Sequence, residues 1–369
     1  MKKKKILLLV SHYPDPLINK RLEMLKEKYE VMILYTKRGN ENFVKIEQIN
    51  YRELSISFTN GKFFKRLFYL LKLKKEVKKI IENFNPEYIY AFRLDMLLLV
   101  VYNGFKNKKI IYEIADLHNM IINDSKNIIK VIIRKVLYST ERKACKNVDI
   151  LSITSEKFYD VYFKKFISKD KVIFMPNIPN LKYFEKYKKK TNKEFIIGFI
   201  GVVRYKKQMK MLIEAAEQTN TKVLFAGIAN DDEIMNLTKK KKFVKYYGPY
   251  NYNKEIAELY SKCDCIYSVY DTTLNNVKYA LPNKLYESIY CQLPILESEN
   301  TYLSEIVNEL NVGMSVKSDS VEDLIEKIKL LKTNKEIYEN IVKNCKNNKK
   351  TNDMSLYDKE FLKKLDNIK

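Results

Sequence analysis

Glycine, histidine and tryptophan are scarce in this sequence, and their scarcity excludes several classes of enzyme. The 369 residues include 8 glycines, 2 histidines and no tryptophan. ILLLVSHYPDP has no glycine and GFIGVVR has only Gly198 and Gly201, so the GxGxxG fingerprint of nicotinamide and flavin enzymes is missing. A P-loop, a GxSxG nucleophile elbow and an HExxH zinc motif are missing too.

Cysteine is also rare, and its spacing excludes the common zinc patterns. The 5 cysteines form no CxxC pair and none lies near a histidine; they are Cys145, Cys263, Cys265, Cys291 and Cys345. No group of His, Cys and carboxylate residues has metal-ligand spacing, so we expect neither a metal nor another cofactor. An odd and scattered set of cysteines fits the reducing cytoplasm.

Long hydrophobic runs are absent. The longest, MLLLVVYNGF, is interrupted by Asn103 and Gly104, and a membrane span needs roughly 20 apolar residues. The apolar run near the start, Ile6–Val10, is shorter than the core of a secretory signal and is typical of a buried strand. We therefore expect a cytoplasmic protein, with peripheral contact at the inner face of the cell membrane as an option.

Basic residues are abundant, and the formal net charge is +24. Such a charge is typical of proteins that bind nucleic acid or a membrane surface. It also results from a composition rich in Lys, Asn, Ile and Tyr, which an AT-rich genome produces without any functional reason. The charge is spread over the whole chain and is not interleaved with aromatic residues on one face. This distribution favours compositional bias, and we expect no nucleic-acid partner.

Short apolar runs alternate with longer helical patterns along the chain. Strands that are apolar throughout and separated by helices predict an α/β fold with parallel sheets covered on both faces. Strands are expected at 6–10, 31–35, 88–91, 110–114, 150–154, 196–200, 222–226, 265–270 and 294–296; helices at 19–28, 62–84, 126–145 and 210–218.

A charged stretch at residues 181–194 interrupts this alternation and reads as a linker, the alternative being a long surface loop within one domain. It separates an N-terminal domain at 1–180 from a C-terminal domain at 195–345. The remaining segment, 346–369, is expected to be helical and to pack back on the N-terminal domain.

Ligands of open parallel sheets bind at the carboxyl ends of the strands, so the loops there are the candidate site. VSHYPDP follows the first expected strand and contains His12 and Asp15. EIADLHN follows the fourth and contains Asp116 and His118. Both histidines of the chain therefore fall in such loops, although a histidine that only caps or hydrogen-bonds remains an alternative for each.

The segment ALPNKLYESI, residues 280–289, predicts an anion site at the start of a helix. Pro282 suits the first helical position, and the amides after it lack intrahelical partners, so they favour an anion together with the helix dipole. Asn283 and Lys284 add side-chain donors. Glu287 follows Asn283 by one turn and would accept hydrogen bonds from ribose hydroxyls. The alternative is a capped helix with Glu287 on a solvated face.

Two segments resemble the donor half of GT-B glycosyltransferases, in particular the large retaining family four (group 1). They are IGFIGVVRYKKQMKMLIEAAE and YDTTLNNVKYALPNKLYESIYCQLPILESENTYLSEIVNELNVGMSV. The resemblance covers most of the chain, is strong in residues 196–316 and is loose before residue 110. It implies two Rossmann-like βαβ domains whose parallel sheets face a cleft.

The resemblance also implies roles for single residues. Arg204 and Lys207 match the basic pair that holds the donor diphosphate, with Lys206 as a rival for the second position; Glu287 matches the ribose-binding glutamate. His118 matches a histidine on the acceptor side that reaches the transferred sugar. The remaining donor-binding residues are expected to be Gly201, Tyr279, Leu281, Pro282, Asn283 and Lys284. Tyr279 replaces a glutamate that the family often has eight residues before the ribose one, so the contact to the sugar cannot simply be transferred.

We expect a metal-independent glycosyltransferase that moves a sugar from a nucleotide-sugar to a lipid-linked or surface-polysaccharide acceptor. Retention of stereochemistry is implied by the resemblance alone. One alternative is a sugar-nucleotide epimerase of the same architecture, for which Asp15, Glu113 and Asp116 supply candidate acid/base groups. A basic nucleic-acid-binding protein is the other.

A helix expected at residues 62–84 predicts contact with an anionic membrane. Its apolar stripe is Phe63, Leu67, Leu70, Leu73, Val77, Ile80 and Phe84. A second apolar row of Phe64, Phe68 and Leu71, set among many lysines, is typical of a helix that lies on anionic lipid. The alternative is a solvated basic helix with a wide core face.

Overall fold

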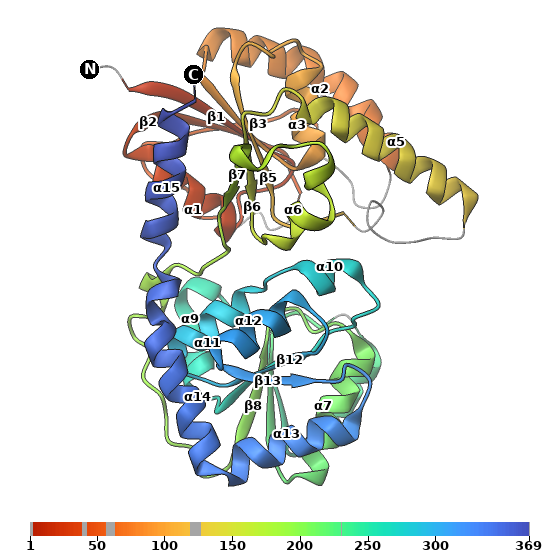
Figure 1. Ribbon diagram of the computed structural model, residues 1–369, viewed down its shortest axis with the longest axis vertical. Coiled ribbons are helices and arrows are strands. Elements are labelled where there is room, and N and C mark those ends of the chain that lie inside the picture. The colour runs from red at the N-terminus through yellow and green to blue at the C-terminus, as the bar shows by residue number, and fades with distance from the viewer. Residues whose placement is uncertain (1–2, 39–42, 57–62, 119–126, 230, 369) are drawn as a thin grey trace. The chain divides into compact units, whose positions relative to one another are not determined.

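The computed structural model describes residues 3–38, 43–56, 63–118, 127–229 and 231–368, with side chains omitted for 63–68 and 351–352. The chain forms two compact units (Figure 1). The first consists of Met1–Pro176 and Ser355–Lys369, and the second is Asn177–Met354. Each unit contains one parallel sheet between helices, so the predicted fold class is confirmed.

The first unit has a 7-stranded sheet in the order β3-β2-β1-β4-β5-β6-β7. Its strands are β1 Lys4–Val10, β2 Tyr29–Tyr35, β3 Asn50–Glu53, β4 Tyr88–Phe92, β5 Lys109–Ile114, β6 Ile150–Ile153 and β7 Val172–Phe174. Ile6 to Val10 are fully buried, as expected for a central strand covered on both faces. The strand order reverses between β1 and β4, which makes that pair the switch point of the sheet.

Helices cover both faces of this sheet. They are α1 Pro16–Lys26, α2 Phe63–Phe84, α3 Arg93–Val101, α5 Ile128–Cys145, α6 Lys157–Val161 and α15 Met354–Asp366, with short 3-10 turns at Phe163–Lys165 and Lys169–Lys171. The first helix begins earlier than the predicted residue 19, because the Asp15 side chain accepts a hydrogen bond from the Ile18 amide at 2.9 Å and caps it.

The C-terminal helix α15 packs on the sheet of the first unit. Phe361 is fully buried, and its ring stacks on Tyr90 with centroids 5.6 Å apart. The Tyr29 hydroxyl donates a hydrogen bond to Asp366 at 3.2 Å. The C-terminal segment that belongs to the first unit therefore begins at Ser355. It lies within the range 346–369 that is expected to be helical.

The second unit has a 6-stranded sheet in the order β10-β9-β8-β11-β12-β13. Its strands are β8 Ile196–Ile200, β9 Lys222–Ala226, β10 Val244–Gly248, β11 Cys265–Ser268, β12 Ile295–Ser298 and β13 Gly313–Val316. The strand order reverses between β8 and β11, so this sheet repeats the topology of the first.

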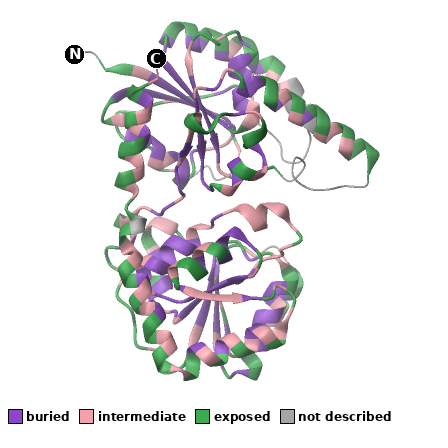
Figure 2. Cartoon of the chain, viewed as in Figure 1, coloured by how far each residue is buried: buried purple, intermediate pink, exposed green. Residues whose placement is uncertain are grey.

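The helices of the second unit connect its strands or follow the last one. They are α7 Lys206–Gln218, α8 Asp232–Lys240, α9 Tyr252–Ser261, α10 Asn275–Tyr279, α11 Asn283–Cys291, α12 Tyr302–Leu310, α13 Val321–Thr333 and α14 Lys335–Asn347, with 3-10 turns at Leu181–Phe184 and Asn348–Asn352. Figure 2 shows that the strands are largely buried and that exposure concentrates on the outer faces of the helices.

Residues 181–194, expected to be a linker, begin with side chains that pack into the second unit. Phe184 is 1% exposed and its ring contacts those of Tyr260 and Tyr290, with centroids 5.9 and 5.6 Å apart. The Tyr187 hydroxyl donates to the Cys291 carbonyl at 2.7 Å. The many lysines of this stretch favour a solvated linker. Its aromatic rings nevertheless contribute to the core of the second unit.

None of the helices in the described part of the chain combines the length and apolarity that crossing a membrane requires.

Candidate active site

The switch point of the second sheet is shaped by two glycines at strand ends. Gly201 follows β8 with φ 142° and Gly227 follows β9 with φ 135°, conformations that L side chains rarely adopt. A Cβ on Gly227 would lie 1.9 Å from the Gly201 carbonyl oxygen, and one on Gly201 would lie 2.9 Å from Lys284 Nζ. Both positions therefore require glycine, and the backbone approaches the lysine closely.

The loop after Gly201 presents two cations that have no carboxylate partner among the described residues. Arg204 and Lys207 are exposed, and neither forms an ion pair with a described residue. The Arg204 guanidinium lies 5.0 Å from the centre of the Tyr205 ring. Lys206 differs, because its Nζ pairs with Asp231 at 3.6 Å and with Glu233. The structure thus distinguishes the two neighbouring lysines that the sequence left as rivals.

Tyr205 holds this loop in a strained conformation. It is the N-cap of α7 and has φ 64° and ψ 62°, the left-handed region, which costs a non-glycine residue about 1 kcal/mol or more. Its ring contacts that of Tyr270, which follows β11, with centroids 5.1 Å apart. The loops after the two switch-point strands are therefore joined through these rings.

Lys284 is the buried cation of the site. The residue is only 9% exposed, and its Nζ donates a hydrogen bond to the Tyr270 hydroxyl at 3.0 Å. Nζ lies 4.7 Å from the centre of the Phe199 ring and 5.6 Å from that of Tyr270. No described carboxylate pairs with it. Burial of a charge is costly unless it is paired, so this position is suited to an anionic ligand.

The start of α11 lies beside this lysine. Pro282 is its N-cap in extended conformation, φ −77° and ψ 153°, and Asn283 is the first helical residue, so the expectation that Pro282 would be the first helical residue is wrong by one position. No side chain of the described residues caps this helix, and its first turn has no acidic residue. The first amides of α11 are therefore not engaged by a described side chain and could donate hydrogen bonds to an anion. Leu281, which precedes the cap, is buried and Asn283 is half-buried.

Glu287 does not lie on a solvated face. It is 3% exposed, and its Oε1 accepts from the Tyr252 hydroxyl at 2.5 Å while Oε2 accepts from Tyr260. Burial and the adjacent carboxylate raise the pKa of both tyrosines well above the ordinary value. A carboxylate oxygen can accept two hydrogen bonds, so ribose hydroxyls would be the second donors to oxygens already held by tyrosines. Tyr279 ends α10 and is half-buried.

The candidate residues of the first unit follow β1 and β5. His12 Nε2 lies 3.9 Å from Asp15 Oδ2, and its Nδ1 lies 2.7 Å from the Tyr13 carbonyl oxygen. Asp15 also caps α1. Asp116 and His118 are both exposed in the loop after β5.

Glu113, a candidate acid/base group, lies in β5 and is bound in the core. Its carboxylate accepts from Arg21 Nη2 at 2.9 Å and from Arg21 Nε at 3.1 Å, and both side chains are fully buried. The Tyr90 hydroxyl donates to it as well. Burial alone would lower the pKa of the Arg21 guanidinium. The adjacent Glu113 carboxylate has the larger combined effect, so the pKa is raised. Glu113 is thus a structural ion-pair partner.

The sequence did not single out Phe199, Tyr205, Tyr252, Tyr260 and Tyr270. Tyrosine is too common in this chain, with 28 residues, for one to stand out. Tyr270 did carry a signal, because it was the last residue of an expected strand and so stood at the carboxyl edge of the sheet.

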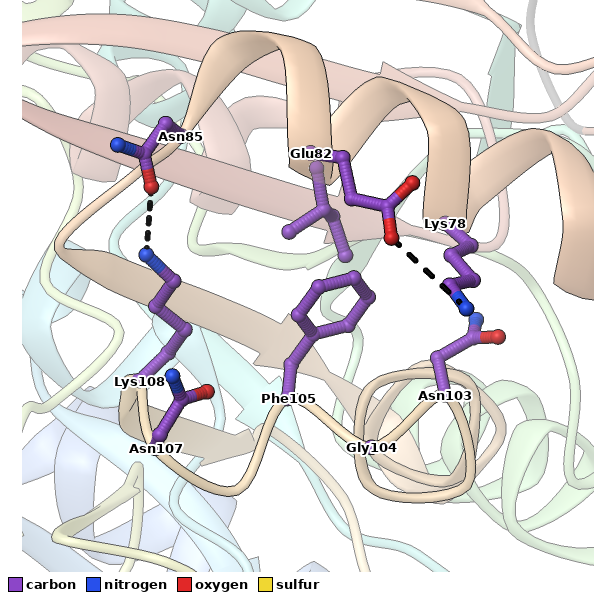
Figure 3. Close-up of a pocket in the computed structure, with 9 residues that line it drawn as sticks. Lys78, Glu82, Asn85, Asn103, Gly104, Phe105, Asn107 and Lys108 are labelled. Atoms are coloured by element: carbon purple, nitrogen blue, oxygen red, sulfur yellow. Dashed lines mark hydrogen bonds and ion pairs between the residues drawn. The ribbon is translucent and has the colours of Figure 1, made fainter.

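A hollow of about 460 Å³ on the first unit is lined by other residues (Figure 3). Lys78, Glu82, Asn85, Asn103 and Phe105 are among its lining residues. It is formed by segments that precede β4 and β5, so it lies at the amino ends of the strands, the edge opposite to the loops described above. Among the described residues no three His, Cys, Asp or Glu side chains gather as ligands of a metal.

Comparison with known proteins agrees with this arrangement in the second unit. Residues 181–348 match the model of the family described as glycosyl transferases group 1. This segment resembles a group 1 glycosyl transferase domain. The resemblance stated from the sequence is confirmed for this domain, and no curated protein sequence matches the chain.

Solved structures show that the whole chain has the GT-B fold. Sucrose-phosphate synthase from Thermosynechococcus elongatus has a TM-score of 0.77 and 15% identity, over 98% of this chain and 99% of that one. Anabaena Alr3699/HepE in complex with UDP has a TM-score of 0.72 and 14% identity, over 99% and 100%. UDP-GlcNAc 2-epimerase from Neisseria meningitidis, bound to UDP-GlcNAc, has a TM-score of 0.64 and 14% identity, over 98% and 99%.

Proposed function

We propose that this glycosyl transferase moves a sugar from a nucleotide-sugar donor to a lipid-linked or surface-polysaccharide acceptor, with retention and without a metal ion. The observation that carries the proposal is Lys284, a buried cation beside the uncapped start of α11 with no carboxylate partner among the described residues. A nucleoside diphosphate supplies the anion that this position lacks. The complex of Anabaena HepE with UDP supports a uridine nucleotide as the first donor to test.

Departure of the diphosphate builds negative charge that the second unit can neutralise. Lys284 would stabilise the phosphates from the buried side, together with the first amides of α11. Arg204 and Lys207 would approach from the exposed loop, because neither is held by a described carboxylate. Positioned cations and dipoles of this kind stabilise a leaving group without reorganisation during the reaction. Glu287, fixed by Tyr252 and Tyr260, would accept from the ribose.

The acceptor would be bound by the first unit, with His118 near the transferred sugar and His12, Asp15 and Asp116 in neighbouring loops. A lipid-linked acceptor would agree with contact between α2 and an anionic membrane. The core stripe of α2 is buried at Leu73, Val77 and Ile80, whereas Leu71 is 64% exposed. Phe64 and Phe68 lie outside the described side chains, so the second apolar row rests on Leu71.

A thermal-shift series with UDP, GDP, ADP and CMP, each also as a nucleotide-sugar, tests the donor site. A ligand present at 100 times its dissociation constant stabilises the folded chain by about 2.7 kcal/mol. We expect one nucleotide class to raise the melting temperature, equally with and without EDTA. Absence of any shift would contradict the donor site, and a shift abolished by EDTA would contradict metal independence.

An epimerase is the second candidate, favoured by the similarity to UDP-GlcNAc 2-epimerase. Of the three carboxylates considered for acid/base chemistry, Glu113 is held by Arg21 and Asp15 caps α1. Asp116 is exposed and remains the candidate. Incubation with a nucleotide-sugar and no acceptor separates the two functions, because an epimerase returns an isomer with the diphosphate still attached. A glycosyltransferase returns the donor unchanged or slowly hydrolysed.

A further inference from the structure

The first half of α5 carries isoleucines that are exposed in the part of the chain that the structure describes. Ile128, Ile129, Ile132 and Val136 are 75%, 68%, 56% and 56% exposed, and we call these four residues the α5 ridge. No residue from 127 to 136 is buried. Figures 1 and 2 show this end of α5 projecting from the first unit, with its surface exposed. Burial of such side chains is favourable, so their exposure requires a reason.

The ridge lies opposite the side of α5 that faces the core. Ile128, Ile132 and Val136 are spaced by four residues and share one face. The residues that α5 buries, Leu137, Glu141, Ala144 and Cys145, occupy the other side and begin only after the ridge. A helix that only covers a core is polar on its outer face. Helix propensity does not explain the ridge either, because isoleucine and valine form helices less readily than alanine or lysine.

The exposed surface of α5 carries basic residues and no carboxylate. Lys130, Lys135, Arg142 and Lys143 are exposed, and none forms an ion pair with a described residue. The one acidic residue of α5, Glu141, is buried and accepts from the hydroxyls of Tyr112 and Tyr162 at 2.5 and 2.7 Å. Apolar and positively charged side chains therefore share the outer face.

We propose that the α5 ridge inserts into the headgroup region of an anionic lipid bilayer. A helix with inserted Ile and Val side chains and flanking Lys and Arg binds such a surface through apolar burial together with attraction to anionic lipid. A second copy of the chain fits less well, because its own basic residues, part of a net charge of +24, would repel those of α5. The proposal concerns binding alone and stands whether or not the chain transfers a sugar.

Co-sedimentation with vesicles tests the ridge without any substrate. The full chain should bind vesicles of phosphatidylglycerol and phosphatidylcholine, bind pure phosphatidylcholine at least tenfold more weakly, and dissociate as salt is raised. The double variant Ile128→Ser/Ile132→Ser should bind the anionic vesicles at least tenfold more weakly. Lys130→Gln/Lys135→Gln should lose about fivefold per charge. Both variants should melt at the wild-type temperature, because residues 127–136 contribute nothing buried.

Matched controls locate the binding surface. Leu356 is 58% exposed on α15, and Leu356→Ser should leave vesicle binding unchanged. Leu71→Ser tests α2, which is the rival surface. Loss of binding in the Leu71 variant with normal binding in the ridge variants would overturn the proposal in favour of α2. A wild-type chain that is dimeric by light scattering, and becomes monomeric when the ridge is changed, would assign the ridge to a second copy instead.

Discussion

The two sheets of this protein have the same topology but different chemistry at their switch points. In the first unit, α1 follows β1 and its N-terminus is occupied by the chain's own Asp15 carboxylate. In the second unit, the helices beside the switch point have Tyr205 and Pro282 as their N-cap residues, and no described side chain caps either helix. An uncapped helix start can accept an external anion, whereas a start capped by a carboxylate repels one.

The glycines and the buried lysine reinforce this difference. Gly201 and Gly227 bring backbone close together after β8 and β9, where Lys284 points its ammonium group at the same loop. The corresponding loop of the first unit, SHYPDP, has two prolines and no glycine. One fold thus provides two edges for ligands, and only the second has the features of a phosphate site. The difference lies in a few residues at strand ends, while the strand order is the same.

Equivalent strands also treat a buried glutamate differently. β5 and β12 occupy the same place in their sheets, and each buries a glutamate completely, Glu113 and Glu297. Glu113 is paired with Arg21. Glu297 accepts from the Ser315 hydroxyl at 2.5 Å through Oε1, and its Oε2 has no described hydrogen-bond partner. Burial without a cation raises the pKa of Glu297 to about 8.

The largest effects should come from the two exposed cations of the second switch point, Arg204 and Lys207. Arg204→Ala and Lys207→Ala should each lower turnover about 100-fold, because each removes a charge that acts on the departing diphosphate. Stability should change by less than about 0.5 kcal/mol, since both side chains are exposed. Lys206→Ala is the matched control, because Asp231 and Glu233 already hold that lysine. Loss of turnover in the Lys206 variant alone would shift the role by one residue.

Lys284→Met should weaken nucleotide binding about 10–100-fold, the effect of losing a charged hydrogen bond worth about 1.5–3 kcal/mol. Methionine keeps the apolar length of the side chain, so the ligand-free fold should be as stable as wild type or more stable. Isothermal titration calorimetry with the best nucleotide measures the first effect and thermal melting the second. His12→Ala in the first unit should leave the affinity unchanged. Equal losses in both variants would remove the contrast between the two switch points.

Glu297 should make stability depend on pH. The Glu297 carboxyl has a pKa of about 8 in the folded chain, against an ordinary value of 4.5 when it is exposed in the unfolded chain. The folded chain therefore binds this proton more tightly than the unfolded chain does. The contribution to stability is therefore fully present below about pH 4.5. It falls by up to about 1.4 kcal/mol per pH unit as the pH rises toward 8, and is constant above that.

The variant Glu297→Gln mimics the protonated form and should remove that slope. It should melt at the wild-type temperature at pH 5 and above it at pH 8. Glu113→Gln is the contrasting variant, because it leaves the buried Arg21 charge unpaired and should destabilise by about 3–5 kcal/mol at either pH. An unchanged slope in the Glu297 variant would show that the carboxyl is solvated in the folded chain.

Glu287→Gln should weaken binding of the best nucleotide about tenfold, because an amide replaces one of the two acceptor oxygens offered to the ribose. Alanine is a poorer choice, since it would leave the hydroxyls of Tyr252 and Tyr260 without their acceptor and destabilise the domain. The 2′-deoxy form of the nucleotide tests the contact directly. It should bind wild type more weakly than the ribose form and show a smaller difference in the variant. If the affinity difference between the ribose and 2′-deoxy forms were the same in wild type and variant, Glu287 would not contact the ribose.

The fold could be predicted because its signal is local. Runs such as Ile6–Val10 and Ile196–Ile200 are short and apolar on both faces, which is typical of strands in a covered parallel sheet. Element boundaries were less accurate. Asp15 moves the start of α1 to Pro16, and Phe184 attaches a lysine-rich stretch to the second unit. Both depend on side-chain contacts that hydrophobic spacing does not reveal.

The candidate site could be predicted in part for a related reason. Lys284, Glu287 and Arg204 stood out as charged residues at a helix start or a strand end. Their partners did not, because Tyr252, Tyr260 and Tyr270 approach from other elements and resemble the many other tyrosines of the chain. The ion pair of Lys206 with Asp231 is likewise a tertiary contact, and it distinguishes the environments of two adjacent lysines that the sequence spacing treats alike.

The smallest effect should come from the capped switch point. Asp15→Ala removes the side-chain acceptor for the Ile18 amide, and loss of such a cap costs about 1 kcal/mol. The variant should therefore melt a few degrees lower than wild type. It should bind the nucleotide with wild-type affinity, because the capped start of α1 lies in the first unit and the donor site is proposed for the second. Asp15→Ser keeps a capping oxygen without the charge and should recover most of the stability. Should either variant alter nucleotide affinity several-fold at constant stability, the division of donor binding between the units would fail, and the loop after β1 would have to contribute to the donor site.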